Sequence, residues 1–213
     1  EVKSVRKDES RLVALETEDQ LIEAEQFVFT PAFEIIADIL EKEAPAEWIQ
    51  SLRRVNYLGN VCLVLRLSRS LSETYWLNVK DPGFPFVGGI EHTNFDTPAN
   101  YAGAHIIYLS RYLATSDPVW DYSHKEFVAF AVSHLKKMFP EFDESWIIDN
   151  AVWKAEFAQP VTERNYSQYV PDNSTPFENA VISTMAHIYP EDRGTNYAIR
   201  EGRRIAKRLS SNG

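Results

Sequence analysis

The sequence predicts an α+β protein built around a mixed or antiparallel sheet, and three observations support this class. Several short segments alternate apolar and polar residues, as half-buried strands do. Other segments repeat apolar residues every three or four positions, which is the period of an amphipathic helix. The 213 residues are 44% hydrophobic and 25% charged, ordinary proportions for a globular chain of one sizeable domain or two small ones.

The first thirty residues predict a strand meander that leads into two helices. Residues 11–17 alternate as a strand, and residues 21–30 follow as a longer one. Pro31 ends the second strand, because it lacks the N–H that a sheet ladder needs, and it suits the first turn of a helix. We therefore expect two short helices next, over residues 32–43 and 46–54.

The middle of the chain predicts a sheet and one long helix. Ser123 followed by Glu126 is the pattern of a capping box, and Pro140 ends the helix that it opens. One face of this helix is apolar: Phe127, Phe130, Ala131, His134, Leu135 and Met138. The strands are expected over residues 57–67, 74–79, 87–93, 105–110 and 146–157.

The C-terminal residues predict a strand, a polar loop and a last helix. The strand covers residues 180–186, and the helix runs from about residue 195 to 209. Its small apolar stripe is expected to pack against a sheet and consists of Ala198, Gly202, Ile205, Ala206 and Leu209. Basic side chains fill its other side and its C-terminal half, where they complement the helix dipole.

Composition excludes several classes of protein. A formal net charge of −9 argues against binding to nucleic acid or to an anionic membrane surface. No apolar run approaches the ~20 residues of a membrane span, and no signal peptide is visible. The single cysteine, Cys62, is expected to be a small buried hydrophobe, and the absence of a pair suits a reducing compartment. We expect a cytoplasmic protein.

The loop before the last helix is one candidate for chemistry. The helix opens with Gly194, Thr195 and Asn196, and its first N–H groups have no partner within the helix. Such an end can hold an anion or a ligand carbonyl. A purely structural cap explains the same residues, so the pattern alone leaves both interpretations open.

His92 is the one histidine that we consider as an acid or base. In an extended strand it would share a face with Asn94, while Glu91 would lie on the opposite face. A hydrogen-bonded structural histidine is the alternative. No histidine has a partner at metal-ligand spacing, so no metal site is expected.

A family resemblance changes the weight of these interpretations. Residues 188–203, IYPEDRGTNYAIREGR, closely resemble the C-terminal segment of bacterial FAD-dependent oxidoreductases of the amine oxidase and protoporphyrinogen oxidase superfamily, which includes the UDP-galactopyranose mutases. Residues 89–95 (GIEHTNF) and 158–161 (AQPV) look like further marks of the subgroup. Residues 27–31 (FVFTP) are similar to the strand that leads from the FAD domain into the substrate domain.

The resemblance implies FAD as cofactor, a small-molecule substrate and a set of site residues. The positions beside the flavin would be Tyr189, Arg193, Gly194, Thr195 and Asn196. The substrate side would use His92 as the catalytic acid or base, together with Glu91, Asn94 and Tyr108. The implied layout is an FAD-domain remnant over 1–39, a substrate domain over 40–171 and the C-terminal FAD-domain strand, loop and helix over 172–213.

The chain departs from the family in one respect: it contains no GxGxxG unit for the FAD diphosphate. We therefore expect the second half of a longer enzyme, inactive alone, which could dimerise through the face it exposes. The leading function is hydride transfer between flavin and a small organic substrate. A redox-neutral nucleotide-sugar mutase is less favoured, because the chain is acidic and its middle lacks clustered arginines. A non-catalytic binding or assembly domain is the third interpretation.

Overall fold

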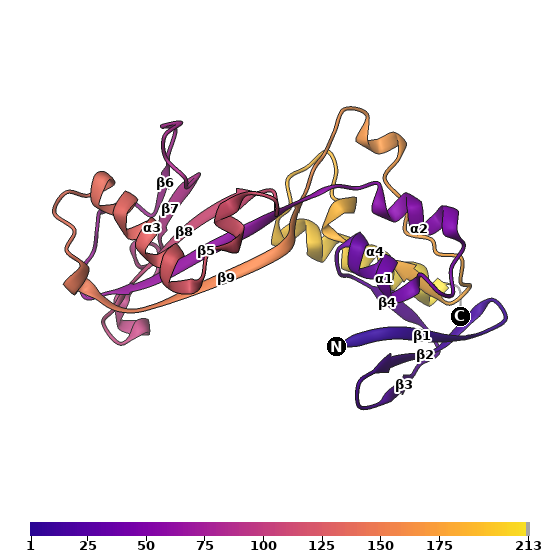
Figure 1. Ribbon diagram of the computed structural model, residues 1–213. Coiled ribbons are helices and arrows are strands. Elements are labelled where there is room, and N and C mark those ends of the chain that lie inside the picture. The colour runs from indigo at the N-terminus through magenta and orange to yellow at the C-terminus, as the bar shows by residue number, and fades with distance from the viewer. Residues whose placement is uncertain (212–213) are drawn as a thin grey trace. The chain divides into compact units, whose positions relative to one another are not determined.

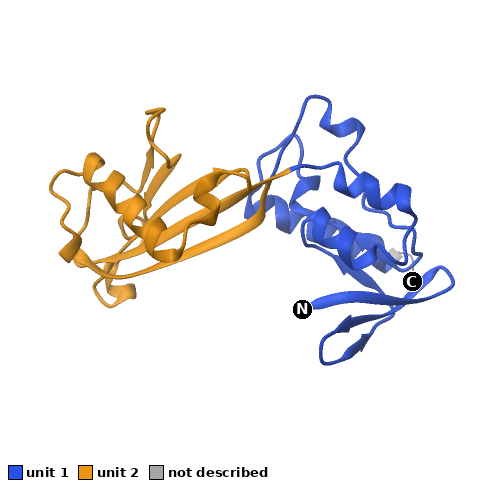
Figure 2. Cartoon of the chain, viewed as in Figure 1, with its two compact units in different colours: residues 1–56, 160–213 blue, residues 57–159 orange. Residues whose placement is uncertain are grey.

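The computed structural model describes residues 1–211 and divides into two compact units (Figures 1 and 2). The first unit contains residues 1–56 and the chain from Pro160 onward, and the second contains Tyr57–Gln159. The second unit is therefore an insertion in the sequence of the first. Residues 40–56 and 160–171, which the sequence analysis assigns to a substrate domain, make their contacts within the first unit.

An antiparallel meander opens the first unit. It consists of β1 (Val2–Asp8), β2 (Arg11–Thr17) and β3 (Leu21–Glu23), which lie side by side in Figure 1. The strand expected over residues 21–30 is wrong as a single element. The chain leaves the meander after β3, and β4 (Phe27–Phe29) joins a different sheet.

A parallel pair of short strands forms the centre of this unit. β4 runs beside β10 (Ala180–Ile182), with Val28 opposite Val181. Phe27 and Phe29 are buried, as is the inner face of α1 (Phe33–Leu40), which is followed by α2 (Ala46–Arg53). Parallel strands are normally covered on both faces. Val28, on the other face of β4, nevertheless remains 44% exposed.

The last helix, α4 (Thr195–Ser211), covers that face only in part. Ile205 is 3% exposed, but Ala198, Gly202 and Ala206 are exposed. The expectation that the whole small-residue stripe is packed is therefore wrong for this chain. The stripe instead lines an open groove of about 360 Å³, together with Val28 and other residues of the first unit.

The second unit is a five-stranded antiparallel sheet with one helix on one face. The strand order is β6-β7-β8-β5-β9, and the elements are β5 (Tyr57–Leu67), β6 (Trp76–Asn78), β7 (Gly88–Glu91), β8 (His105–Leu113) and β9 (Ile147–Pro160). Along β5 every second residue is buried, from Gly59 to Leu67. Helix α3 (His124–Met138) packs on this buried face through Phe127, Ala131, Val132 and Leu135.

Several predicted elements are confirmed. The capping box is complete: the Ser123 side chain accepts the Glu126 N–H, and the Glu126 side chain accepts the Ser123 N–H. Helix α3 ends two residues before Pro140. The antiparallel sheet and the four α-helices within residues 1–211 confirm the α+β class. None of the helices within residues 1–211 has the length and apolar composition needed to cross a membrane.

Candidate functional site

The predicted cofactor residues lie in the loop that precedes α4 and in the first turn of that helix. The carbonyl of Gly194 accepts the N–H groups of Tyr197 and Ala198, both at 3.0 Å, and this begins the helix. The N–H groups of Thr195 and Asn196 precede that first turn and have no acceptor among residues 1–211. A Cβ at position 194 would lie 2.6 Å from the Asn196 Oδ1, so the Asn196 side chain would have to move to admit one.

Two side chains of the same loop lie near this helix end in sequence. Tyr189 is 40% exposed, and its ring centroid is 5.4 Å from that of buried Tyr166. Arg193 is half-buried. Arg200, on the first turns of α4, forms an ion pair with Glu191 at 2.8 Å, and this guanidinium lowers the pKa of the Glu191 carboxyl.

His187 has a structural place in the same segment. Its Nδ1 accepts the Thr184 N–H at 2.9 Å, and its ring packs edge-on against Phe33. Burial lowers the pKa of His187, which favours the neutral ring. Among residues 1–211, no three His, Cys, Asp or Glu side chains lie together as a metal site.

In the second unit, β7 ends at Glu91 and the chain turns. Residues His92–Asn94 form a 3₁₀ turn, because the N–H groups of Phe95 and Asp96 both bind the His92 carbonyl at 2.9 Å. The expectation of an extended strand to residue 93, with His92 and Asn94 on one face, is therefore wrong.

Glu91 and Asn94 both bind one neighbouring loop. Glu91 is 4% exposed, and its carboxylate accepts the hydroxyl of Ser70 and the N–H groups of Leu71 and Ser72 at 2.5, 3.0 and 2.9 Å. The Asn94 amide donates to the carbonyls of Ser72 and Thr74 at 2.8 and 3.1 Å. These contacts hold residues 70–74 against the end of β7.

His92 belongs to a separate polar cluster. Its Nε2 is 2.6 Å from the Tyr101 hydroxyl, which in turn donates to Asp96 Oδ2 at 3.1 Å. The Tyr108 ring meets the imidazole edge-on, with ring centroids 6.0 Å apart. The structure thus brings together the predicted residues His92 and Tyr108. Sequence reasoning missed Tyr101 and Asp96, because neither belongs to a periodic strand or helix pattern.

The face of the sheet opposite α3 carries an apolar row. Cross-strand pairing aligns Trp76 with Ile90, Ile90 with Tyr108, and Tyr108 with Val64. Trp76 is 54% exposed, whereas Ile90, Tyr108 and Val64 are half-buried. Cys62 is half-buried on the same face, and burial raises the pKa of its thiol. This face therefore offers a row of apolar side chains, including Tyr108, for contact with a ligand.

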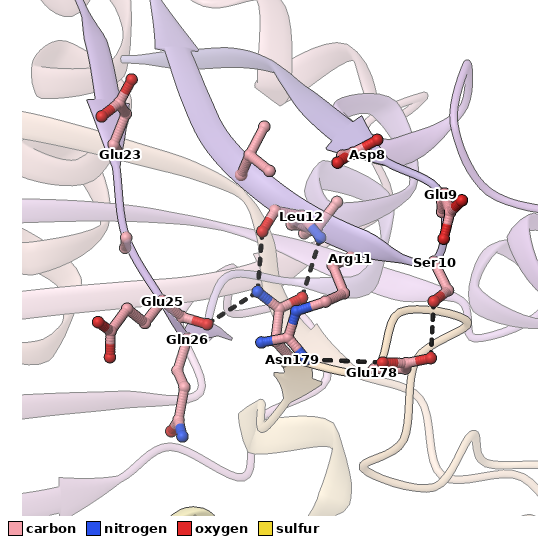
Figure 3. A pocket seen from close by; sticks show the side chains of 12 residues that line it. Asp8, Glu9, Ser10, Arg11, Leu12, Glu23, Glu25, Gln26, Glu178 and Asn179 are labelled. Atoms are coloured by element: carbon pink, nitrogen blue, oxygen red, sulfur yellow. Dashed lines mark hydrogen bonds and ion pairs between the residues drawn. The ribbon is translucent and has the colours of Figure 1, made fainter. Parts of the chain in front are cut away.

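A large hollow beside the meander has an acidic lining (Figure 3). Its volume is about 1060 Å³, and its carboxylates come from Asp8, Glu9, Glu23, Glu25 and Glu178. Asn179 at its floor binds the backbone of Leu12 and the carbonyl of Glu25, and Glu178 binds Ser10 at 2.7 Å. These side chains hold the meander to the segment before β10.

These features define an α+β chain in which an antiparallel sheet unit is inserted in a unit with parallel strands and a C-terminal strand, loop and helix. The family described as flavin-containing amine oxidoreductase matches residues 1–210, and the chain belongs to this family. The resemblance found in the sequence is thereby confirmed. No curated protein matches the chain significantly in sequence.

Solved structures share the fold at low identity. A protein of Exiguobacterium sp. 255-15 assigned as a protoporphyrinogen oxidase matches with a TM-score of 0.77 at 9% identity, over 100% of this chain and 46% of its own. A putrescine oxidase variant matches with a TM-score of 0.73 at 12% identity, over 100% and 48%. A reduced UDP-galactopyranose mutase matches with a TM-score of 0.54 at 12% identity, over 78% and 33%. The chain thus spans just under half the length of the first two structures and 33% of the mutase structure.

Proposed function

We propose that the chain supplies the substrate face and one flavin contact of an FAD-dependent oxidoreductase of the amine oxidase type. The observation that carries this proposal is the family match over residues 1–210. FAD, when bound, supplies the two-electron chemistry, and the substrate is a small organic molecule that gives up a hydride. The residues of this chain bind the substrate, orient it and exchange protons with it.

The start of α4 fits the flavin edge that becomes negative on reduction. The N–H groups of Thr195 and Asn196 are available as donors, and the helix dipole adds partial positive charge. Arg193 adds a positive charge to the same loop. Tyr189, partly exposed, would pack against the ring edge. We assign these residues to flavin contact.

The apolar row on the sheet of the second unit is assigned to the substrate. Tyr108 and its cross-strand neighbours provide an apolar floor, and His92 beside Tyr108 is the acid or base. Glu91 and Asn94 act by holding residues 70–74, because their polar atoms are already engaged there.

Residues 1–213 contain no GxGxxG unit, so another segment must hold the FAD diphosphate. The exposed face of β4 and the groove along α4 are surfaces that such a segment would cover. We expect the chain alone to retain little FAD and to be inactive. A homodimer formed through the same apolar groove is the alternative use of this surface.

The test is to express the gene from which the chain derives in full, beside residues 1–213 alone. We expect a flavin absorbance band in the full product only, and bleaching of that band when a panel of amines is added without oxygen. Bleaching by no organic substrate, or a full product that binds no flavin, would refute the proposal. Light scattering on residues 1–213 tests the dimer.

A further inference from the structure

The thirteen residues between β7 and β8, 92–104, form a hydrogen-bonded turn that carries three interacting side chains. Thr97 accepts the Ala99 N–H at 3.3 Å, and Pro98 follows it as the first residue of a 3₁₀ turn. The turn closes through the Gly103 N–H, which binds the Pro98 carbonyl at 2.9 Å. This backbone fixes the positions of His92, Asp96 and Tyr101.

Asp96, one of these three side chains, is held in its ionised form. The Thr97 N–H, and then the Tyr101 hydroxyl and the Asn100 amide, bind the oxygens of Asp96 and lower the pKa of its carboxyl. An ionised carboxylate only accepts hydrogen bonds. The Tyr101 hydroxyl must therefore donate to Asp96, and its oxygen lone pairs face His92.

This direction fixes the proton on the imidazole. Because the Tyr101 oxygen accepts, the His92 Nε2 at 2.6 Å must carry the hydrogen. The neutral ring then presents an unprotonated Nδ1, for which residues 1–211 provide no hydrogen-bond partner. Tyr101 and Tyr108 both meet the imidazole edge-on, at 86° and 90°, so the ring plane is fixed as well.

We propose that Asp96 and Tyr101 are positioning residues that hold His92 as a general base whose Nδ1 takes a proton from a protonated amine substrate. This inference rests on the proposed function. An ammonium group must lose a proton before the adjacent carbon can release a hydride, because otherwise positive charges would develop on neighbouring atoms. The substrate N–H bond breaks, an N–H bond forms at Nδ1, and no electrons are transferred in this step. Asp96 stabilises the resulting imidazolium through Tyr101.

The test measures the protonation of the two His92 ring nitrogens by ¹⁵N NMR in residues 1–213, without flavin. We expect a protonated Nε2 and an unprotonated Nδ1 in the neutral ring, with the Nε2 hydrogen visible because it exchanges slowly with water. An unprotonated Nε2 in the wild-type chain would overturn the proposal.

Variants separate the hydrogen-bonded chain from the intrinsic preference of imidazole. Tyr101→Phe removes the acceptor, so the Nε2 hydrogen signal should be lost to fast exchange. A signal that persists in Tyr101→Phe, with the backbone amide spectrum retained, would also overturn the proposal. If Tyr101→Phe does not fold, Asp96→Asn is used instead. Its Nε2 hydrogen signal should also be lost, and a signal that persists would overturn the proposal.

Two controls complete the design. Tyr112→Phe changes a tyrosine of β8 that is 41% exposed and should leave the His92 signal intact. His124, bound to Asn150 at 2.6 Å, reports in the same spectra that the variants act locally. Since no flavin is present, a failure of the proposed function would leave these spectra unchanged.

Discussion

The side chain of Asn179 binds both backbone polar groups of Leu12, a residue 167 positions earlier in the chain. Its Oδ1 accepts the Leu12 N–H at 2.9 Å, and its Nδ2 donates to the Leu12 carbonyl and to the Glu25 carbonyl, both at 2.8 Å. Asn179 is 6% exposed, so these bonds replace water that cannot reach the site. One side chain thus joins the meander to the segment before β10.

Asn179→Ala should lower the free energy of unfolding by about 3 kcal/mol, because buried backbone groups of Leu12 and Glu25 lose their partners. Denaturant unfolding of the purified chain measures this. The matched control is Gln26→Ala, an exposed side chain beside the same hollow, with an expected change under about 0.5 kcal/mol. Equal effects of the two variants would contradict the assigned role.

Glu91→Ala should destabilise the second unit by about 3 kcal/mol, since the donors of residues 70–72 would be left without an acceptor. Proteolysis of residues 70–74 should become faster in this variant. Glu73→Ala, which removes an exposed carboxylate of the same loop, is the control and should behave as the wild type. If Glu91→Ala unfolds at the wild-type denaturant concentration, the anchoring role is wrong.

Two glycine substitutions should have opposite effects on the melting temperature. A Cβ at Gly59 would lie 2.7 Å from the Trp120 ring, so Gly59→Ala should be destabilising by about 1 to 3 kcal/mol. A Cβ at Gly202 meets nothing within 4 Å, so Gly202→Ala should stabilise α4 by up to about 1 kcal/mol. Calorimetry of both variants checks the pair, and a destabilised Gly202→Ala chain would mean that the groove is closed in solution.

The stability of the first unit should fall as the pH drops below the usual histidine range. Burial lowers the pKa of His187 in the folded state below its ordinary value of 6.5, so the unfolded chain binds more protons just below that pH. The stability contributed by the neutral His187 ring is complete above pH 6.5. It is lost progressively as the pH falls toward the pKa of His187 in the folded state. His187→Asn keeps an acceptor for the Thr184 N–H and should flatten this part of the curve. An identical pH dependence in the variant would exclude His187 as its source.

Local patterns predicted those parts of the fold that short-range chemistry determines. The bounds of β2 and β5 and the capping box of α3 follow from alternation and from two side chains three residues apart. The break between β3 and β4 could not be predicted, because Asn179 binds Glu25 from 154 residues away. The partners of His92 were missed for a related reason: the 3₁₀ turn that carries them has no period.

The candidate site also combines features that local sequence predicts with features that it does not. Residues 189–196 are contiguous in sequence, so a local motif predicts them as one segment, and their contact with flavin stays a prediction. The exposure of Ala198 and Gly202 could not be anticipated, since a stripe of small residues predicts packing without identifying what packs on it.

We propose that the N–H groups at the start of α4 stabilise the reduced flavin, and the flavin reduction potential of the full-length protein tests this role. Thr195→Pro removes one N–H at the first helical position, where proline is tolerated, and Thr195→Ala keeps it. The loss of a hydrogen bond to a charged group, about 1.5 to 3 kcal/mol, predicts a two-electron potential lower by about 30 to 60 mV in Thr195→Pro. Thr195→Ala should match the wild type. Equal potentials in all three proteins would contradict the account.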